Sequence, residues 1–469
     1  MLTSDSPAPA SVCTTSPAFT SFGALRAREF ARLDEGGHTY LDYTGSALYP
    51  ERIVAEHAAM LRGSVLGNPH SDSPASRAST ALIDEARARV LRFFDADADE
   101  YVVCFTANTS AAIHLVGSAF AFGPDAPFVL AADNHNSVNG IREYAARAGA
   151  AVHHVPLDVD LRLHDVASRL AVLAQTHDGV GLFAFPAQSN FSGVQHPLGL
   201  VRKARSLGYT VLLDAAAFAP TSPLSLRAVP ADFVACSFYK MFGYPTGVGA
   251  LVARREALER LRRPWFAGGT VEYVSVQHGT HLLRGGAEAF EDGTANFLAI
   301  GAVIEGLDFV DEVGLANVKR HTSALAEQLA RILRSLAHDD GSPLVLVYGP
   351  REHYDRGGTV TFNVLDRDGA TLPYERVEAL ARAQRISVRG GCFCNPGASE
   401  AAFEFVPERA AVALEETRHE GWSLDAFARR MRERGGSRGI GAVRASVGIP
   451  TDANDVERLV ALVESMRPD

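Results

Sequence analysis

Short apolar runs alternate with helix-like segments through the first half of the chain, and this alternation limits the fold more than any other feature. The strand-like runs are Tyr101–Phe105, Phe128–Ala132, Ala151–Val155, Gly181–Phe185 and Thr210–Leu213. Short apolar strands separated by helices indicate a mostly parallel sheet with helices on both faces. The sequence therefore predicts an α/β fold.

A chain of 469 residues is longer than one hydrophobic core usually organises, so we expect a large and a small domain. We predict a flexible N-terminal arm over residues 1–25, a large domain over 51–314, and a small α+β domain from 26–50 and 315–469. The elements expected in the last part are helix Leu315–Leu336, strands Leu344–Val347 and Thr359–Asn363, helix Leu372–Gln384, strand Ala442–Val447 and helix Asn454–Met466.

Composition excludes several classes of protein. The formal net charge of −10 argues against nucleic acid as a partner. No apolar run approaches the roughly 20 residues that span a bilayer, and the N-terminal segment lacks the basic start and apolar core of a signal peptide, so we expect no membrane association. Five cysteines, an odd number, do not form a disulfide framework and favour a cytoplasmic location.

Lys240 is unusual because the sequence contains only two other lysines, Lys203 and Lys319, which stand beside arginines in helix-like segments expected to be exposed. Lys240 instead lies between the apolar runs 233–236 and 250–253, which predict a strand, a turn and a second strand. Apolar surroundings lower the pKa of an amine and make it a nucleophile that can form a Schiff base. The structural alternative is a lysine that extends from a strand end into solvent.

Polar side chains follow the carboxyl ends of the predicted strands, where ligands bind in parallel sheets. Thr109 and Ser110 begin a helix after the first strand, and a helix N-terminus with hydroxyls suits an anion. His135 follows the second strand, Asn190 follows the fourth, and Asp214 ends the fifth. Each of these side chains alone has a structural alternative, such as a helix cap.

Together with Lys240, these residues supply what pyridoxal phosphate requires. Asp214 is suited to the pyridine nitrogen, which it keeps protonated so that the ring accepts electrons from a substrate carbanion. His135 is suited to stacking on the ring, and Lys240 to forming the Schiff base. The predicted phosphate cradle consists of Thr109, Ser110, Ser237 and Tyr239.

Cys392 and Cys394 stand in a loop bounded by glycine and proline, GGCFCNPG. A thiol that must reach a cofactor-bound substrate belongs on such a loop, so we interpret one of them as a nucleophile. The alternatives are an incidental pair in a buried turn and a metal site, for which Cys-x-Cys supplies too few ligands; we expect no metal. Cys104 and Cys236 lie in apolar strands and are expected to be inert.

Arg444 lies in a predicted strand, VRASVG, that is otherwise mostly apolar. A guanidinium in that position is suited to binding the α-carboxylate of an amino acid through two parallel hydrogen bonds. The alternative is a surface arginine, which is common in this chain.

These motifs carry a resemblance to a known family. The sequence resembles the class V aminotransferase superfamily, in particular cysteine desulfurases, and most closely the desulfurase-like N-terminal domain of molybdenum cofactor sulfurases. The resemblance implies fold type I of pyridoxal-phosphate-dependent transferases. The matching stretches are GNPHS (67–71), DNHNSV (133–138), SNFSG (189–193), SFYKMFGYPTGVGAL (237–251), GGT (268–270), FEDGTANFL (290–298), GCFCNPGA (391–398) and VRASVG (443–448).

The resemblance implies an enzyme that removes sulfur from L-cysteine and releases L-alanine, with Lys240, His135 and Cys394 as its catalytic residues. Lys240 holds the cofactor and moves protons, and Cys394 takes the sulfur as a persulfide. Asn190 lies by the phenolic oxygen of the cofactor, and Arg444 binds the substrate carboxylate. In a homodimer, Thr270 reaches the phosphate of the partner subunit's cofactor.

The sequence departs from the family pattern at three places. Ala217 stands where many desulfurases have a glutamine that binds the phenolic oxygen, and Cys392 stands where many have histidine. Cofactor sulfurases continue into a further domain, whereas this sequence ends at Asp469, so we expect a separate sulfur-acceptor protein or different chemistry on the same scaffold. The alternatives are a carbon–sulfur lyase or other β-elimination or replacement enzyme, and a non-catalytic sulfur relay that binds no cofactor.

Overall fold

A computed structural model describes residues 19–352, 354–435 and 439–467. Its centre is a seven-stranded sheet with the strand order β2-β8-β7-β6-β5-β3-β4. Only β8 runs antiparallel to its neighbours, which confirms the predicted mostly parallel α/β sheet. The strands are β2 (Tyr101–Thr106), β3 (Phe128–Ala131), β4 (Val152–Val155), β5 (Leu182–Pro186), β6 (Thr210–Asp214), β7 (Phe233–Ser237) and β8 (Gly249–Arg254).

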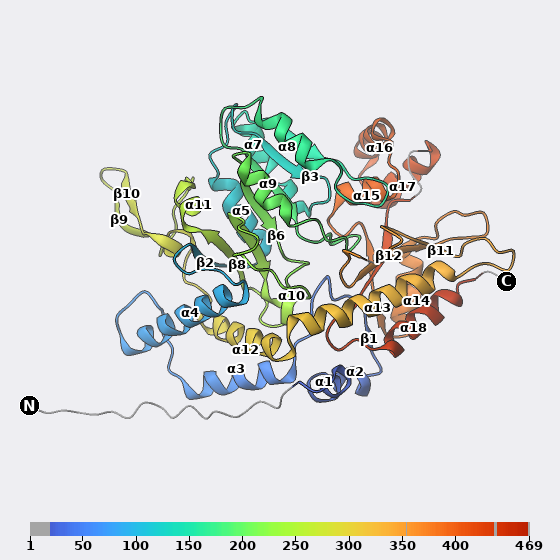
Figure 1. Cartoon of the computed structure of the whole chain (residues 1–469), viewed down its shortest axis with the longest axis horizontal. Coiled ribbons are helices and arrows are strands. Elements are labelled where there is room, and N and C mark those ends of the chain that lie inside the picture. The colour runs from blue at the N-terminus through green and yellow to red at the C-terminus, as the bar shows by residue number, and fades with distance from the viewer. Residues whose placement is uncertain (1–18, 353, 436–438, 468–469) are drawn as a thin grey trace, which may run out of the picture.

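Helices cover both faces of this sheet (Figure 1). Neighbouring strand residues alternate between two hydrophobic clusters: Val129 and Val211 belong to one, Leu130 and Leu212 to the other. This alternation arises because successive side chains of a strand point to opposite faces. The helices associated with the sheet are α3 (Glu51–Gly63), α4 (Pro74–Phe93), α5 (Thr109–Ala119), α7 (Arg142–Arg147), α8 (Val166–Ala174), α9 (Gly199–Ser206), α11 (Arg255–Arg260) and α12 (Phe297–Val313).

A second, antiparallel sheet has its own hydrophobic core. Its strand order is β11-β12-β15-β14, and its core includes Leu325, Phe362, Leu459 and, from near the N-terminus, Leu41. The division into residues 51–314 and 26–50 with 315–469 stays a prediction. The elements are α13 (Leu315–Ser335), β11 (Val345–Val347), β12 (Thr359–Val364), α14 (Tyr374–Ala383), β14 (Arg389–Gly391), β15 (Ala442–Ser446) and α18 (Ala453–Glu464).

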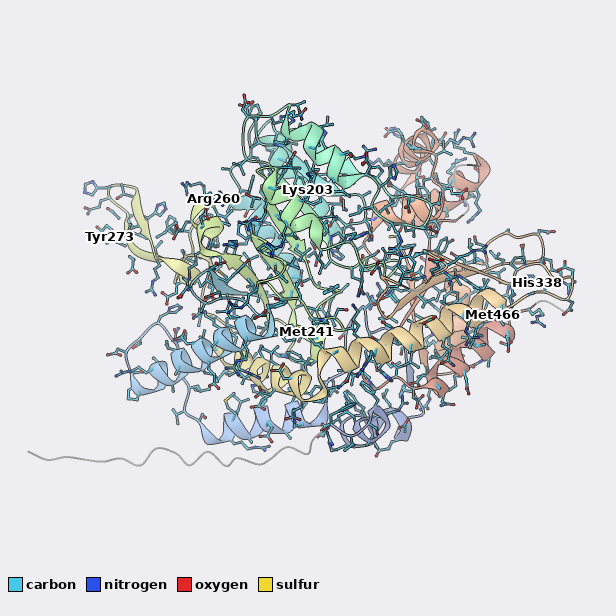
Figure 2. All side chains as sticks on the ribbon, in the orientation of Figure 1. Lys203, Met241, Arg260, Tyr273, His338 and Met466 are labelled. Carbon is cyan, nitrogen blue, oxygen red and sulfur yellow. The ribbon has the colours of Figure 1, made fainter. Side chains whose placement is uncertain are left out.

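Several elements had no counterpart in the sequence prediction. The hairpin of β9 (Val271–Ser275) and β10 (Thr280–Leu283) projects from the large sheet and carries the exposed Tyr273, whereas His338 and Met466 lie at the opposite end of the molecule (Figures 1 and 2). The others are α2 (Arg32–Glu35), α6 (Asn136–Asn139), η1 (Gly286–Phe290), α15 (Pro396–Ala402), α16 (Pro407–Glu420) and α17 (Leu424–Glu433). Strands expected at 38–43 and from residue 386 are present as β1 (Thr39–Tyr40) and β13 (Ile386–Ser387), which form a small parallel pair.

The N-terminal arm was predicted to reach residue 25, but helix α1 begins at Phe22 and runs to Glu29. Ser21 caps this helix by accepting a hydrogen bond from the Ala24 backbone N–H, and Leu25 is buried. Residues 1–18 of the expected arm lie outside the described residues. None of the described helices combines the length and the hydrophobicity that a membrane crossing needs.

Candidate active site

A cavity of about 350 Å³ opens at the carboxyl ends of the large-sheet strands. Its volume lies within the range of pockets that hold small ligands, about 300–1,000 Å³. Eight of the predicted site residues line it together: Thr109, Ser110, His135, Asn190, Asp214, Ser237, Tyr239 and Lys240. Residues that are separated by up to 131 positions, from Thr109 to Lys240, thus meet at the strand ends, where ligands bind in such sheets.

Lys240 lies on a short helix, α10 (Phe238–Phe242), between β7 and β8, where the sequence predicted only a turn. Gly243 ends this helix in the left-handed conformation, with φ 77°, which a glycine adopts without strain. Burial lowers the pKa of the Lys240 amine, and Asp214 partly opposes this effect. Lys203 and Lys319 are exposed, as predicted, whereas Lys240 lines the cavity.

Asp214 is the last residue of β6 and is buried. Its Oδ1 accepts a hydrogen bond from the Ala216 backbone N–H at 2.9 Å. Among the described residues, its Oδ2 has no hydrogen-bond donor. This oxygen is therefore available to a protonated ring nitrogen in the cavity.

His135 is held in one ring orientation by the start of α6. The Ser137 backbone N–H donates to His135 Nδ1 at 3.1 Å, so that a neutral ring carries its proton on Nε2. Burial lowers the pKa of His135, while Asp214 acts in the opposite direction. The ring is thus neutral near pH 7, which suits stacking on an aromatic cofactor.

Hydroxyl groups cluster at the N-terminus of α5. The Thr109 backbone N–H donates to Ser237 Oγ at 2.7 Å, and the Thr109 and Ser237 hydroxyls lie 2.5 Å apart. Ser110 Oγ lies 2.6 Å from Ser137 Oγ. Converging hydroxyls and backbone N–H groups at the start of an eleven-residue helix suit a phosphate group.

Cys394 is exposed on the loop between β14 and α15 and does not line the cavity. The loop is attached to the cavity wall next to His135, because the Asn136 backbone N–H donates to the Cys394 carbonyl oxygen at 2.7 Å. Phe393 and Cys394 both have φ of 55°, in the left-handed region that side chains other than glycine rarely adopt. Cys392, also exposed, begins the same turn.

The Cys394 loop also connects to a buried polar network that the sequence analysis missed. Asn395 Nδ2 donates to Asp133 Oδ1 at 2.6 Å and to Asn190 Oδ1 at 2.9 Å, and Asn190 Nδ2 donates to the Phe393 carbonyl at 2.7 Å. Asp133 also pairs with His196 at 2.8 Å. Asn190 was expected by the phenolic oxygen, but its amide is largely occupied by this loop.

Arg444 is buried on β15 and does not line the cavity. Its guanidinium donates to the Asn190 carbonyl at 2.9 Å and to Asp42 at 3.1 Å, and it lies 4.7 Å from the centre of the Phe393 ring. Its Nε is buried with no hydrogen-bond partner among the described residues. Burial lowers the pKa of Arg444 to about 10, and Asp42 opposes this effect. The surface alternative is therefore wrong.

Thr270 is buried away from the cavity of its own chain and bonds to Ala267 through its hydroxyl. Its predicted contact with a phosphate requires a second subunit and stays a prediction. Cys104 and Cys236 are buried, and burial raises the pKa of both thiols, so the prediction that they are inert core residues is supported. Within the described ranges, no group of three or more His, Cys, Asp or Glu side chains is arranged to hold a metal ion.

The residues present fit pyridoxal phosphate. An amine with a lowered pKa, a carboxylate with an unpaired oxygen, a neutral imidazole and a hydroxyl cluster surround one cavity. These groups correspond to the aldehyde, the pyridine nitrogen, the ring face and the phosphate of that cofactor.

Comparison with known proteins decides the family. The profile of the family described as aminotransferase class-V matches residues 39–459. The chain belongs to the class V aminotransferase family. Its fold is that of a solved cysteine desulfurase from Thermococcus onnurineus NA1, with a TM-score of 0.76 and 25% identity over 95% of this chain and 97% of that chain. The resemblance in sequence and the predicted fold type I are thereby confirmed.

Curated relatives include molybdenum cofactor sulfurases. Those of Drosophila mojavensis and of Oryza sativa subsp. japonica are each 35% identical to this chain over 94% of its length. The alignments cover 59% and 57% of these relatives, so this chain spans a little more than half of their length.

Proposed function

We propose that this protein is a pyridoxal-phosphate-dependent cysteine desulfurase, which removes sulfur from L-cysteine as a persulfide on Cys394 and releases L-alanine. The observation that carries the proposal is the Lys240 amine, whose pKa is lowered, in the wall of the cavity that it shares with Asp214, His135 and the hydroxyl cluster. Pyridoxal phosphate is the cofactor that fits this site in a class V aminotransferase.

When bound, the cofactor supplies an electron sink that weakens the bonds of a substrate amino acid. Lys240 would hold the cofactor through its amine and would then move protons at the substrate carbon. Asp214 would hold the ring nitrogen, since its Oδ2 has no donor among the described residues. The phosphate would be held by Thr109, Ser110, Ser237 and Tyr239, and His135 would orient the ring by stacking.

Arg444 would bind the substrate carboxylate, and its contact with the carbonyl of Asn190, a residue that lines the cavity, supports this role. The Cys394 thiolate attacks the substrate sulfur, so that a sulfur–sulfur bond forms as the carbon–sulfur bond breaks. The electron pair of the broken bond stays on the carbon, which is protonated to give alanine. An acceptor thiol then takes the sulfur from the Cys394 persulfide, so we also propose a separate sulfur-acceptor protein.

Two further parts of the proposal concern the whole protein. A homodimer brings Thr270 of one subunit to the phosphate of the other, since Thr270 does not reach the cavity of its own chain. A cytoplasmic location agrees with the odd number of cysteines.

The test uses purified protein loaded with pyridoxal phosphate. With L-cysteine, we expect alanine and sulfide in the presence of a reducing thiol, and a persulfide that mass spectrometry assigns to Cys394. Cys394→Ala abolishes alanine formation but retains the visible band of the bound cofactor, while Cys392→Ala and Cys104→Ala serve as controls. Pyruvate formation that survives Cys394→Ala would instead establish a carbon–sulfur lyase.

A further inference from the structure

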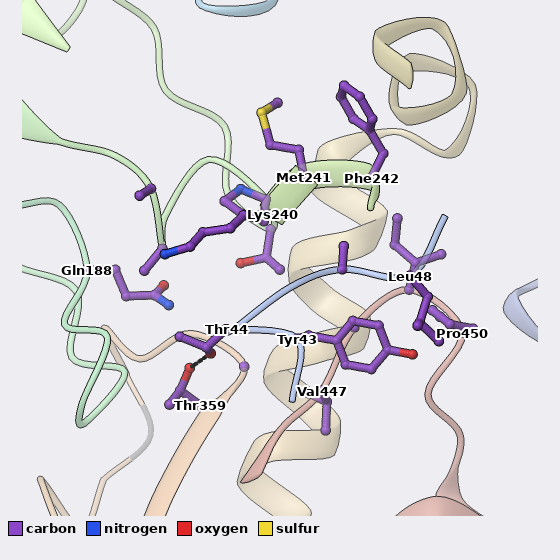
Figure 3. A pocket seen from close by; sticks show the side chains of 18 of the residues that line it. Tyr43, Thr44, Leu48, Gln188, Lys240, Met241, Phe242, Thr359, Val447 and Pro450 are labelled. Carbon is purple, nitrogen blue, oxygen red and sulfur yellow. Dashed lines mark hydrogen bonds between the residues drawn. The ribbon is translucent and has the colours of Figure 1, made fainter. Parts of the chain in front are cut away.

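Gln188 is a buried residue at the cavity to which neither the sequence analysis nor the comparisons assign a role. Its side chain lies just after β5 and lines the candidate cofactor cavity. It also lines a second, smaller cavity of about 40 Å³. The two cavities share four residues, Gln188, Ala216, Ala217 and Lys240. Figure 3 shows the amide of Gln188 and the amine of Lys240 converging from different elements.

The oxygen of the Gln188 amide is fixed. Gln195 Nε2 donates to Gln188 Oε1 at 2.9 Å and to Ser222 Oγ at 2.9 Å. A Cβ added at Gly357 would overlap the same amide, so the backbone of that glycine passes directly against it. The amide therefore has a defined orientation, with its nitrogen end directed away from Gln195.

The nitrogen of the Gln188 amide has no acceptor among the described residues. The residue is 3% exposed overall, and it lines the candidate cofactor cavity. An amide N–H that faces a cavity without a protein acceptor can donate a hydrogen bond to a ligand there. Lys240, the residue that would carry the cofactor, lines the same two cavities as Gln188.

The chemistry of the cofactor identifies the acceptor. In pyridoxal phosphate, the phenolic oxygen is on the ring carbon next to the one that bears the aldehyde, so it lies close to the lysine nitrogen. Asn190 is the other amide at this end of the cavity, but its oxygen and one N–H are committed to Asn395 and Phe393. Ala217 ends in a methyl group and offers no donor. Gln188 differs from Asn190 in that neither N–H of its amide has an acceptor among the described residues, so Gln188 is the better placed donor of the two.

We propose that the side-chain amide of Gln188 donates a hydrogen bond to the phenolic oxygen of the pyridoxal phosphate held by Lys240. This inference rests on the proposed function. The hydrogen bond stabilises the ionised phenolic oxygen, so it makes protonation of the cofactor–lysine pair less favourable. It also holds the ring against rotation in the cavity.

The test replaces Gln188 by methionine, which keeps the length of the side chain and removes the amide. The visible absorption of the loaded protein is titrated with pH. The pKa of this transition is expected to rise by about one unit, the effect of one lost hydrogen bond to a charged acceptor. Affinity for pyridoxal phosphate is expected to fall about tenfold. Gln384→Met, at an exposed position after α14, serves as the matched control.

The double variant Gln188→Met/Ala217→Gln brings an amide into the same space from the end of another strand. Recovery of the wild-type pKa in this variant supports a donor role for Gln188. An unchanged pKa and affinity in Gln188→Met would overturn the inference while leaving the proposed function intact. It would also be overturned if the cofactor-free variant lost as much thermal stability as the loaded one, because the role of Gln188 would then be structural. If the wild-type protein takes up no pyridoxal phosphate, both proposals fail.

Discussion

The pKa of Lys240 is shifted in opposite directions by burial and by Asp214. Burial lowers the pKa of its amine, and Asp214 raises it. Because only the unprotonated amine attacks an aldehyde, cofactor uptake by the cofactor-free protein increases as pH rises through this pKa. Asp214→Ala removes the raising effect, so the midpoint of the pH–rate profile is expected to move to lower pH. Stopped-flow absorbance measures the rate of cofactor uptake. The control variant Lys203→Ala should have the same midpoint as wild type. A higher midpoint in Asp214→Ala would contradict the expected effect of Asp214.

Arg444 is argued to bind the carboxylate of the substrate through its planar guanidinium. Arg444→Lys keeps a positive charge but removes the pair of parallel N–H groups. The KM for L-cysteine is therefore expected to rise about 10- to 100-fold, with a smaller change in kcat. Steady-state alanine formation gives both constants, with the exposed Arg92→Lys as control. An unchanged KM would exclude Arg444 from substrate binding.

At the scale of elements, the start of helix α15 fixes the Cys394 loop. Asn395 caps this helix, since its Oδ1 accepts from the Ala398 backbone N–H at 3.1 Å, and its Nδ2 joins the loop to Asp133 and Asn190. Asn395→Ala is expected to cost at least about 1 kcal/mol of stability through the lost cap. Persulfide formation should fall about tenfold if the lost bonds to Asp133 and Asn190 held the Cys394 loop in place by about 1.4 kcal/mol of free energy. The visible band of the bound cofactor should be retained.

Chemical denaturation and persulfide mass spectrometry measure the two effects of Asn395→Ala separately. The matched control is Ser423→Ala, which removes the cap of α17, where Ser423 Oγ accepts from the Ala426 backbone N–H. Both variants should lose stability, and only Asn395→Ala should lose persulfide. Equal persulfide yields in the two variants would mean that persulfide formation does not depend on the hydrogen bonds from Asn395 to Asp133 and Asn190.

The strands of the large sheet and the cluster at their carboxyl ends were predictable, because strand period and chain direction determine where side chains converge. The contacts of residues near the C-terminal end of the sequence could not be predicted. Asp42 and Arg444 are 402 positions apart and meet only through packing of β15 against the N-terminal segment. The short helix at Lys240 was also missed, since five residues carry too little periodicity to separate a helix from a turn. Gln188 has no sequence pattern that identifies it.

At the scale of the whole molecule, the β9–β10 hairpin is the surface where we expect a second copy of the chain to bind. It carries the exposed pair Tyr273 and Leu282, which lie opposite each other across the two strands. Trp265 and Phe266 are exposed just before it along the chain. Grouped exposed apolar side chains of this kind mark interaction surfaces. Thr270 immediately precedes this hairpin, so a surface that binds a second copy here would also carry Thr270 toward it.

The proposed homodimer is tested by Tyr273→Glu/Leu282→Arg. Opposite charges on directly facing residues keep the two strands paired and remove the apolar surface. Light scattering over a range of concentrations should find wild type as a dimer and the variant shifted toward a monomer, with weaker binding of pyridoxal phosphate because Thr270 no longer reaches a partner. Val159→Glu, at a valine 98% exposed elsewhere, should remain dimeric. A wild-type protein that stays monomeric at every concentration would contradict both the dimer and the role of Thr270.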